Sequence, residues 1–432
     1  MRNIELEILY KGTQKYSLNM VHNKRKIIND PVHGFITIPN EFIFDIIEHP
    51  YFQRLRYIKQ LGLTYMVYPG AIHSRFQHAL GAMHLMGQAI EMLKLKDNVV
   101  TDEEQQSLML AILLHDVGHG PFSHALEQTL VPGIQHELFS LLFMERLNEM
   151  FDNQLLMAKQ IFADEHPKRF LHQLVSSQLD VDRLDYLMRD SFFTGVSEGV
   201  ISTDRIIKML NVRQDELVVD IKGIYSIEKF IVARRLMYWQ VYLHKTVLSA
   251  EQLLIRVLRR AKYLVEQGEE VFASEALQLF LKLHPTEQDF RTKPELLAVF
   301  AELDDYDVFF CIKTWTKSKD RILRLLSEKL VKRHLLKIEI QDAAFDANYV
   351  DNLKQKTKQA YDLTEEEVGY FVFTDEVANN AYNPVFDKIS MLYRDGSVVD
   401  ITKSSDQINT ELLSRTIRKY FLCYPKLLGG EV

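Results

Sequence analysis

Apolar residues recur with a helical period through much of the chain. Five of them follow one another at spacings of four, three, four and three residues, which places them on one face of a helix: Phe76, Leu80, Met83, Gly87 and Ile90. A second segment, residues 108–114, is apolar throughout and follows Thr101 and Glu104, whose spacing is that of a capping box at a helix start. Because a helix that is apolar all round has no solvated face, we expect this one to run through the interior. Helices are expected to continue to a long stretch at residues 227–263.

β-prone segments flank the helical part of the chain. Residues 1–40 are polar and β-prone, with a turn between short strands at residues 29–34. Beyond about residue 300 the pattern predicts strands at 308–312, 337–341 and 370–374, a hairpin at 389–401 that turns on Asp395 and Gly396, and amphipathic helices at 321–335 and 350–361. The fold class expected is therefore mainly α, with a helical core over residues 41–265, a short β-prone N-terminus at 1–40 and a small α+β C-terminal region at 266–432.

Composition narrows the class of protein. At 432 residues, 47% hydrophobic and 26% charged, the chain is long enough for more than one domain. We expect neither a spanning helix, which needs about 18 apolar residues, nor secretion, because the N-terminus lacks the apolar segment of a signal peptide. Only two cysteines, Cys311 and Cys423, favour a reducing compartment, so we expect a cytoplasmic protein. The net charge of −7 disfavours a general nucleic-acid binder.

His115 and Asp116 stand at the end of the apolar run. An imidazole next to a carboxylate suits a hard or borderline divalent metal, and a charged Asp at the end of a buried helix needs a partner. Further ligands are available upstream at His78, which lies off the apolar stripe, and downstream in residues 178–190, which hold four carboxylates and two arginines. The candidate metal ligands are two imidazoles and two carboxylates: His78, His115, Asp116 and Asp182.

Four blocks carry a resemblance that extends this interpretation. They are residues 52–62, 73–78, 114–124 and 180–186, with the sequences FQRLRYIKQLG, HSRFQH, LHDVGHGPFSH and DVDRLDY. In this order they resemble the HD-domain phosphohydrolases, and most closely their deoxynucleoside triphosphate (dNTP) triphosphohydrolase branch. The resemblance covers roughly residues 26–245 and fades after about 265. It implies an HD-domain helical core that binds a divalent metal, and iron, manganese, nickel, zinc or magnesium is compatible with the ligand set.

The resemblance also implies roles for residues that follow the metal ligands. His119, His124 and His136 would line the α-phosphate, and His124 would protonate the leaving 5′ oxygen as the general acid. Glu127, at a position where the family more familiarly has Asp, would orient His124. An alternative for His136 is that it simply begins a helix.

A site that binds a dNTP also needs cationic side chains that contact the phosphates and residues that distinguish deoxyribose from ribose. The resemblance implies that three arginines contact the triphosphate: Arg75, Arg183 and Arg234. It implies that Gln60 and Leu61 select deoxyribose, and that Tyr186 and Asp190 lie beside the sugar. Gln60 would bind the 3′ hydroxyl, while Leu61 would leave no room for a ribose 2′ hydroxyl.

Other positions match those that hold a guanine nucleotide at a subunit interface in activator-dependent relatives. They are Lys26, Gln53 and Arg56. Glu48 stands where these relatives more familiarly have Asp, and His244 and Lys245 match further interface positions. The resemblance therefore implies a homo-oligomer, dimer or tetramer, that GTP or a dNTP activates. The alternative is that residues 52–61 form an amphipathic helix with a basic face and bind no nucleotide.

The function expected is metal-dependent hydrolysis of dNTPs to deoxynucleoside and triphosphate. One alternative is an HD-type nucleotide monophosphatase or phosphodiesterase, which would use the metal ligands but not the arginines and Tyr186. The other is a non-catalytic nucleotide-sensing or nucleic-acid-binding scaffold, which the negative net charge and the complete ligand set disfavour.

Overall fold

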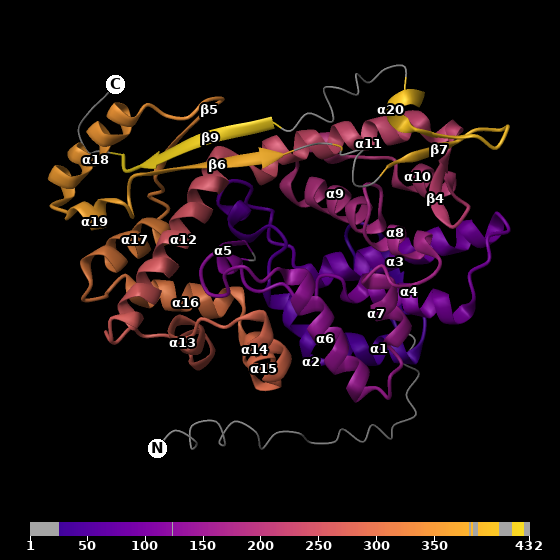
Figure 1. Ribbon diagram of the computed structural model, residues 1–432, viewed down its shortest axis with the longest axis horizontal. Helices are drawn as coiled ribbons and strands as arrows, with labels where there is room; N and C mark the ends of the chain where they lie inside the picture. The colour runs from indigo at the N-terminus through magenta and orange to yellow at the C-terminus, as the bar shows by residue number, and fades with distance from the viewer. Residues whose placement is uncertain (1–25, 123, 380–381, 383–387, 406–416, 427–432) are drawn as a thin grey trace.

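A computed structural model describes residues 26–122, 124–379, 382, 388–405 and 417–426, with the backbone alone for His124 and Asn379. Most of these residues are helical, and small sheets lie around the helices (Figure 1). The mainly α fold class is confirmed. The turn expected at residues 29–34 is also present, because β1 (Ile27–Asp30) and β2 (Gly34–Thr37) pair in an antiparallel hairpin.

Three helices form the centre of the fold: α3 (Arg75–Leu95), α4 (Asp102–Leu114) and α9 (Val181–Thr194). Helix α3 packs against both of the others. The predicted capping box begins α4: the Glu104 backbone N–H donates to Thr101 Oγ1, and the Thr101 N–H donates to Glu104 Oε2. Residues 108–114 are buried throughout, so α4 runs through the interior as expected.

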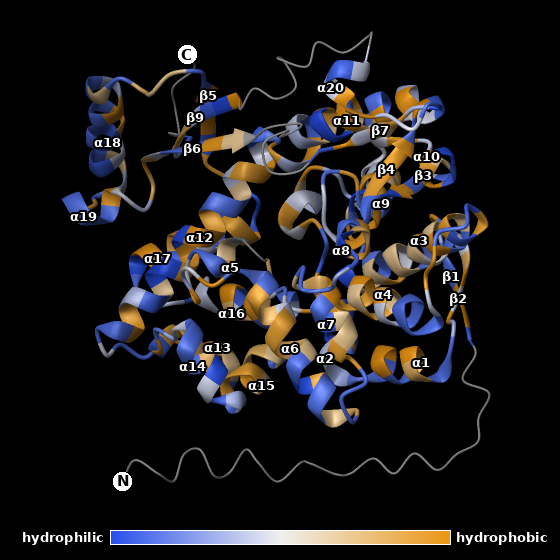
Figure 2. Cartoon of the chain, turned by 45° about the vertical axis from the view of Figure 1, so that its right-hand side comes forward, coloured by the Kyte–Doolittle hydropathy of each residue, from blue (hydrophilic) through white to orange (hydrophobic). Residues whose placement is uncertain are grey.

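Further helices surround this centre and connect it to the C-terminal part. Those that begin before residue 225 are α1 (Glu41–Glu48), α2 (Pro50–Gln53), α5 (His124–Glu127), α6 (His136–Met150), α7 (Leu156–Phe162), α8 (Arg169–Val175), α10 (Thr203–Met209) and α11 (Ile224–Met237). After it they are α12 (Lys245–Glu266), α13 (Glu275–Lys282), α14 (Glu287–Thr292), α15 (Pro294–Glu302), α16 (Asp305–Trp315), α17 (Arg321–Val331), α18 (Ala347–Tyr361), α19 (Glu365–Val368) and α20 (Ile401–Ser404). The predicted helices at 321–335 and 350–361 correspond to α17 and to α18, which is largely hydrophilic (Figure 2).

One sequence-based expectation about secondary structure is wrong. The strand expected at residues 308–312 is part of α16, which Asp304 caps by accepting the Asp307 N–H. Its buried residues, Val308, Cys311, Ile312 and Trp315, follow a helical spacing that outweighs the β propensity of the segment. The helical stretch expected at 227–263 is present as α11 and α12, which a π-helical turn at Tyr238–Tyr242 separates.

The strands build two further sheets. One has the order β3 (Leu210–Arg213), β4 (Glu216–Asp220), β7 (Ser390–Leu392) and β8 (Val398–Asp400). The other has the order β5 (Lys337–Gln341), β9 (Ile417–Tyr424) and β6 (Phe373–Asn379). The predicted strand at 337–341 and the hairpin around Asp395 and Gly396 are present, whereas the strand predicted at 370–374 begins at Phe373. The β3–β4 hairpin was not predicted; Gln214 and Asp215 both have positive φ there, as a tight two-residue turn requires.

The C-terminal part is joined to the helical core through a shared sheet. Strand β7 pairs in parallel with β4, with Ser390 opposite Val218. Helix α12 packs against α13, α17 and β5, so it too bridges the two parts. No helix of the described residues is both long enough and apolar enough to cross a membrane.

Candidate metal centre and its surroundings

The four predicted metal ligands come together at the meeting point of three helices. His78 extends from α3, His115 and Asp116 follow the end of α4, and Asp182 lies in the first turn of α9. His78 Nε2 lies 3.0 Å from Asp182 Oδ1 and 3.4 Å from His115 Nε2. His115 Nε2 lies 3.4 Å from both Asp182 Oδ1 and Asp116 Oδ1. Two nitrogens and two carboxylates therefore surround one small volume.

The remaining nitrogen of each imidazole has a fixed acceptor. His78 Nδ1 lies 2.8 Å from Asp185 Oδ2, and His115 Nδ1 lies 2.7 Å from the carbonyl oxygen of Ile112. Both acceptors require the proton on Nδ1, which leaves the Nε2 lone pairs directed at the centre. When both imidazoles are neutral, these lone pairs converge on one point together with the two carboxylates, where a divalent cation can accept all four. The donor set thus fits a metal ion such as iron, manganese, nickel or zinc.

The charges of the site also favour a cation. Burial lowers the pKa of His78, but hydrogen bonds to Asp182 and Asp185 outweigh burial and raise the pKa to about 10. Burial raises the pKa of Asp182, yet the hydrogen bonds from His115 and His78 hold it well below its usual range. A pocket that stabilises an extra proton this strongly stabilises a metal ion by the same negative potential.

Two further imidazoles and an arginine lie beside Asp116. His119 Nε2 is 3.2 Å from Asp116 Oδ1, and the His119 ring stacks on His136 with 3.7 Å between centroids and 16° between planes. Arg75 Nη1 lies 2.5 Å from Asp116 Oδ2. Asp116, His119 and His136 are close enough to hold an ion of their own. However, lone pairs of parallel rings do not converge, and the Arg75 cation is adjacent, so this side suits an anion better.

The predicted acid–base residues are placed only in part. Glu127 Oε1 lies 3.3 Å from His136 Nδ1, so Glu127 orients His136. The His124 side chain, which Glu127 was expected to orient, lies outside the described residues. His136 also begins α6, so the alternative interpretation of His136 describes its backbone correctly.

Several residues that shape the site were not assigned a role from the sequence. Arg54 donates from Nη1 to the carbonyl oxygens of Val117 and His119, and thereby holds the loop after Asp116. Gly118 lies so close to α6 that a Cβ there would come within 2.2 Å of the His136 oxygen. These contacts join residues far apart in the chain, so no local signal marks them.

Comparison with known proteins identifies the family. Residues 75–190 match the HD domain, and residues 201–287 match the HD associated region. The crystal structure of a phosphohydrolase from Bacteroides thetaiotaomicron is 51% identical and superposes with a TM-score of 0.90, covering 93% of this chain and 100% of that one. The uncharacterised protein YwfO of Bacillus subtilis is 30% identical over 94% of this chain and 93% of its own length. The chain belongs to the HD-domain phosphohydrolase family.

A dNTPase is among the more distant relatives of this HD-domain phosphohydrolase. The Dictyostelium discoideum homolog of the deoxynucleoside triphosphate triphosphohydrolase SAMHD1 is 32% identical over 57% of this chain and 51% of its own length. The chain therefore spans about half of that relative.

The predicted phosphate contacts lie near the centre but already have protein partners. Arg183 Nε donates to the Ser177 carbonyl oxygen at 2.7 Å and lies 3.1 Å from Asp180 Oδ2. Arg234 Nη1 donates to Gln178 Oε1 at 3.2 Å. Both arginines are thus anchored to the segment that leads into α9, beside Asp182.

The predicted sugar contacts lie along two neighbouring walls. The Gln60 backbone N–H donates to the His73 carbonyl oxygen, and Leu61 is half-buried. Asp190 accepts hydrogen bonds from His73 Nε2 at 2.8 Å and from the Tyr242 hydroxyl at 2.7 Å. Since both of its oxygens are occupied and it is 1% exposed, Asp190 positions these side chains, and its sugar contact stays a prediction. Tyr186 lies at the same wall, with its ring 6.3 Å from that of Tyr242.

The predicted regulatory residues lie in two places: Lys26, Glu48, Gln53 and Arg56 lie around α1 and α2, and His244 and Lys245 lie at the start of α12. Arg56 Nε donates to Gln53 Oε1, and its guanidinium lies 3.6 Å above the Phe76 ring. Lys26 Nζ lies 4.3 Å above the Phe44 ring of α1, the helix that ends at Glu48. His244 caps α12 and Lys245 begins it. The alternative of one amphipathic helix over 52–61 is wrong, because only α2 and a 3₁₀ turn at Arg54–Tyr57 are helical there.

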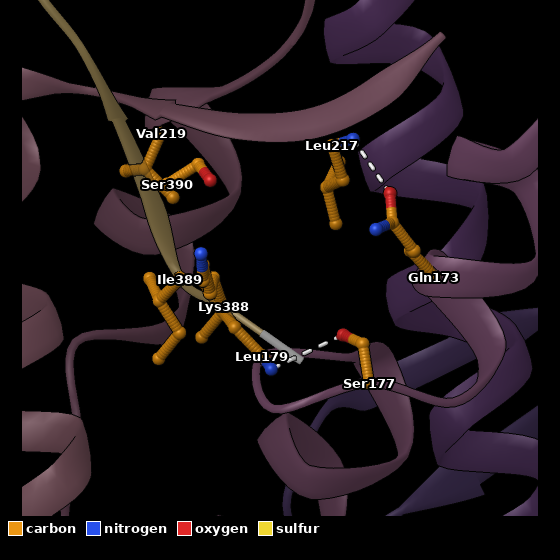
Figure 3. Close-up of a pocket in the computed structure, with 8 residues that line it drawn as sticks. All are labelled: Gln173, Ser177, Leu179, Leu217, Val219, Lys388, Ile389 and Ser390. Atoms are coloured by element: carbon orange, nitrogen blue, oxygen red, sulfur yellow. Dashed lines mark hydrogen bonds between the residues drawn. The ribbon is translucent and has the colours of Figure 1, made fainter. Parts of the chain in front are cut away.

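A small pocket lies where the C-terminal strand β7 meets the helical core (Figure 3). Its walls include Gln173, which accepts the Leu217 N–H, and Ser177, which accepts the Leu179 N–H. Lys388, Ile389 and Ser390 close it from the C-terminal side. The sequence analysis did not foresee this pocket, because its two sides are more than 170 positions apart.

Proposed function

We propose that this HD-domain phosphohydrolase hydrolyses dNTPs to deoxynucleoside and triphosphate. The observation that carries the proposal is that Arg75 and His119 contact the same Asp116 carboxylate that faces His78 and His115, with His136 stacked on His119. Metal ligands thus adjoin donors suited to a phosphate, as cleavage at the α-phosphorus requires. The sequence similarity to SAMHD1 homologues supports the same substrate class.

The proposed reaction assigns a task to each group of residues. A divalent ion held by His78, His115, Asp116 and Asp182 would supply Lewis acidity at the α-phosphate. Burial and then the Arg75 charge hold the pKa of His119 well below its usual range, which favours the neutral imidazole with one N–H. That N–H is directed at Asp116 Oδ1, so donation to a phosphate oxygen would require it to leave this contact. Water adds to the α-phosphorus, the bond to the 5′ oxygen breaks, and His124 delivers the proton that this oxygen needs.

Specificity and regulation complete the proposal. Gln60 and Leu61 would select deoxyribose, while Arg183, Arg234, Tyr186 and Asp190 would hold the tail and sugar. Lys26, Glu48, Gln53 and Arg56, with His244 and Lys245 of a neighbouring subunit, would hold an activating GTP or dNTP in a homo-oligomer. An exposed Arg56 stacked on Phe76 is suited to pairing with a phosphate.

One product analysis tests the substrate and the bond that breaks. Purified full-length protein is incubated with each dNTP, each ribonucleotide, deoxynucleoside monophosphates and cyclic dinucleotides, with Mn²⁺ and with or without GTP. We expect equimolar deoxynucleoside and tripolyphosphate from dNTPs. The Asp182→Asn variant should lose this activity and bind less metal, because an amide cannot supply the anionic ligand. The exposed Asp204→Asn change on α10 serves as the matched control.

Other products would support the alternatives. Orthophosphate from monophosphates, or cleavage of cyclic dinucleotides, would replace the proposal by a monophosphatase or a phosphodiesterase. Nucleotide binding without turnover under every condition would indicate a non-catalytic sensing scaffold.

A further inference from the structure

A buried network of charged side chains connects the N-terminal hairpin to the metal centre. Its middle is Asp185 on α9, whose Oδ2 lies 2.8 Å from His78 Nδ1. The other oxygen, Oδ1, lies 2.6 Å from Nε2 of His33, which belongs to the turn between β1 and β2. Arg189 lies between the two sides: its Nε donates to Asp185 Oδ2 at 2.8 Å, and its Nη1 donates to Asp30 Oδ2 at 2.7 Å. All five side chains are nearly inaccessible to solvent.

The hairpin turn is built to present His33 to α9. Asp30 Oδ1 accepts the backbone N–H groups of Val32 and His33, at 3.0 and 2.9 Å. Gly34 completes the turn with φ of 75°, a value that glycine adopts without strain. Figure 2 shows β1 and β2 beside α3, and β2 packs on that helix. The His33 ring is therefore held by its own turn as well as by Asp185.

Helix α3 leaves room for the network at Gly81. A Cβ at this position would lie 2.1 Å from both Asp185 Oδ1 and Arg189 Nη2, so any larger residue would displace the carboxylate. Gly81 stands three residues after His78 on the same helix. The ligand and the space for its supporting carboxylate thus come from one turn of α3.

We propose that His33 is a positioning residue for the metal ligand His78, acting through Asp185, and that the N-terminal hairpin sets the metal affinity without supplying a ligand. Asp185 can hold the His78 ring in one orientation only if its own carboxylate is fixed. His33 fixes Oδ1, and Arg189 fixes the carboxylate plane. Loss of the His33 hydrogen bond leaves Arg189 as the remaining partner of Asp185 Oδ1, so the carboxylate is held less firmly against His78. Supporting partners of this kind typically change metal affinity about 10–100-fold. This inference rests on the proposed metal centre.

The test measures Co²⁺ affinity in full-length protein by equilibrium dialysis, with the visible Co²⁺ absorption as a signature of ligand geometry. His33→Phe keeps most of the ring volume but removes the hydrogen bond. His33→Gln offers an amide N–H to Asp185 instead. We expect His33→Phe to weaken Co²⁺ binding about 10–100-fold with an altered spectrum, and His33→Gln to restore much of the affinity. His84→Ala is the matched control, because His84 is the half-buried neighbour of His33 and bonds only to Gln88 among the contacts of the described residues.

Thermal unfolding of the metal-free variants separates positioning from folding. If both His33 variants are less stable than wild type, the comparison of His33→Gln with His33→Phe decides: restored Co²⁺ affinity in His33→Gln supports positioning, and equal losses in the two variants overturn the proposal. Wild-type affinity and spectrum in a folded His33→Phe protein would overturn the proposal, as would equal losses in His33→Phe and His84→Ala. The proposed metal centre is tested separately. It is wrong if the wild-type protein binds no Co²⁺, or if Asp182→Asn binds Co²⁺ as tightly as the wild type.

Discussion

The Asp305 carboxylate accepts the backbone N–H of Lys59 at 2.9 Å, across 246 positions of the chain. Its other oxygen accepts the backbone N–H of Phe122 at 3.1 Å. Asp305 is 1% exposed and begins α16, in the C-terminal part. One side chain therefore joins two walls of the site: the segment that contains Gln60 and the loop that follows His119.

Replacing Asp305 should loosen both walls at once. In Asp305→Ala two partly buried N–H groups lose their acceptor, and each such loss in a buried site typically costs about 1–3 kcal/mol. We expect a lower free energy of unfolding in urea and a KM for dNTPs that rises more than kcat changes. Glu302→Ala, an exposed carboxylate at the end of α15, is the control. Wild-type kinetics in a destabilised Asp305→Ala protein would show that the contact serves folding alone.

The general-acid role of His124 predicts a separation between binding and turnover. His124→Ala should keep its metal content and its affinity for a non-hydrolysable dNTP analogue while losing about 10²–10⁴-fold in kcat. His284→Ala, an exposed imidazole paired with Glu266, should leave all three quantities unchanged. Loss of metal in His124→Ala would instead make His124 a ligand.

Sugar selection is assigned to the space beside Leu61. Leu61→Gly should raise the ratio of ribonucleotide to dNTP hydrolysis, because it opens room for a 2′ hydroxyl. Leu61→Met keeps the volume and should keep the discrimination. The measurement is kcat/KM for GTP against dGTP, with the other bases in parallel. An unchanged ratio in Leu61→Gly would place the selectivity in another wall.

Activation at the α1–α2 surface is tested by removing one cation. If Arg56 pairs with an activator phosphate, Arg56→Ala should abolish stimulation by GTP or a second dNTP without changing metal content. Glu48→Asp should sharpen preference for guanine. Lys356→Ala, an exposed cation on α18, is the control. Equal rates with and without GTP in the wild type would remove the regulatory role.

The joint between α12 and α17 predicts an acid-dependent stability. Arg260 Nη2 lies 2.6 Å from Asp320 Oδ2, while Asp320 Oδ1 caps α17 at Leu323. Burial raises the pKa of Asp320, but the Arg260 hydrogen bond outweighs it and lowers the pKa. A lowered folded-state pKa means that this stabilisation is present above the unfolded value of about 3.9 and is lost as the pH falls through the folded value.

Two substitutions divide that stabilisation into its parts. Asp320→Asn keeps the cap and removes the charge, so it should flatten the acid limb of thermal stability. Asp320→Ala also removes the cap and should cost about 1 kcal/mol more at neutral pH. Melting temperatures between pH 3 and 7 measure both effects. Parallel pH profiles for wild type and Asp320→Asn would show that the ion pair contributes nothing.

Local sequence signals predicted the helical centre and the cluster of candidate metal ligands. The Thr101–Glu104 capping box and the apolar run after it define α4, because both act within a few residues. The four candidate ligands could be selected because their residue types are rare in apolar surroundings and their blocks match a family pattern. The hairpin around Asp395 and Gly396 could also be predicted locally, because its turn depends on those two residues.

Contacts between distant segments decided the rest. The β propensity of residues 308–312 was overridden by packing at helical spacing in α16, and strand β7 joined β4 across about 170 positions. The sequence placed Asp185 in a carboxylate-rich run but could not show that His33, 152 positions away, holds one of its oxygens. Nor could it show that Asp305 joins Lys59 to Phe122. A side chain's chemistry is written in the sequence, but its partner is set by the closure of the tertiary fold, which brings buried charges together because each must find an opposite charge or a hydrogen bond.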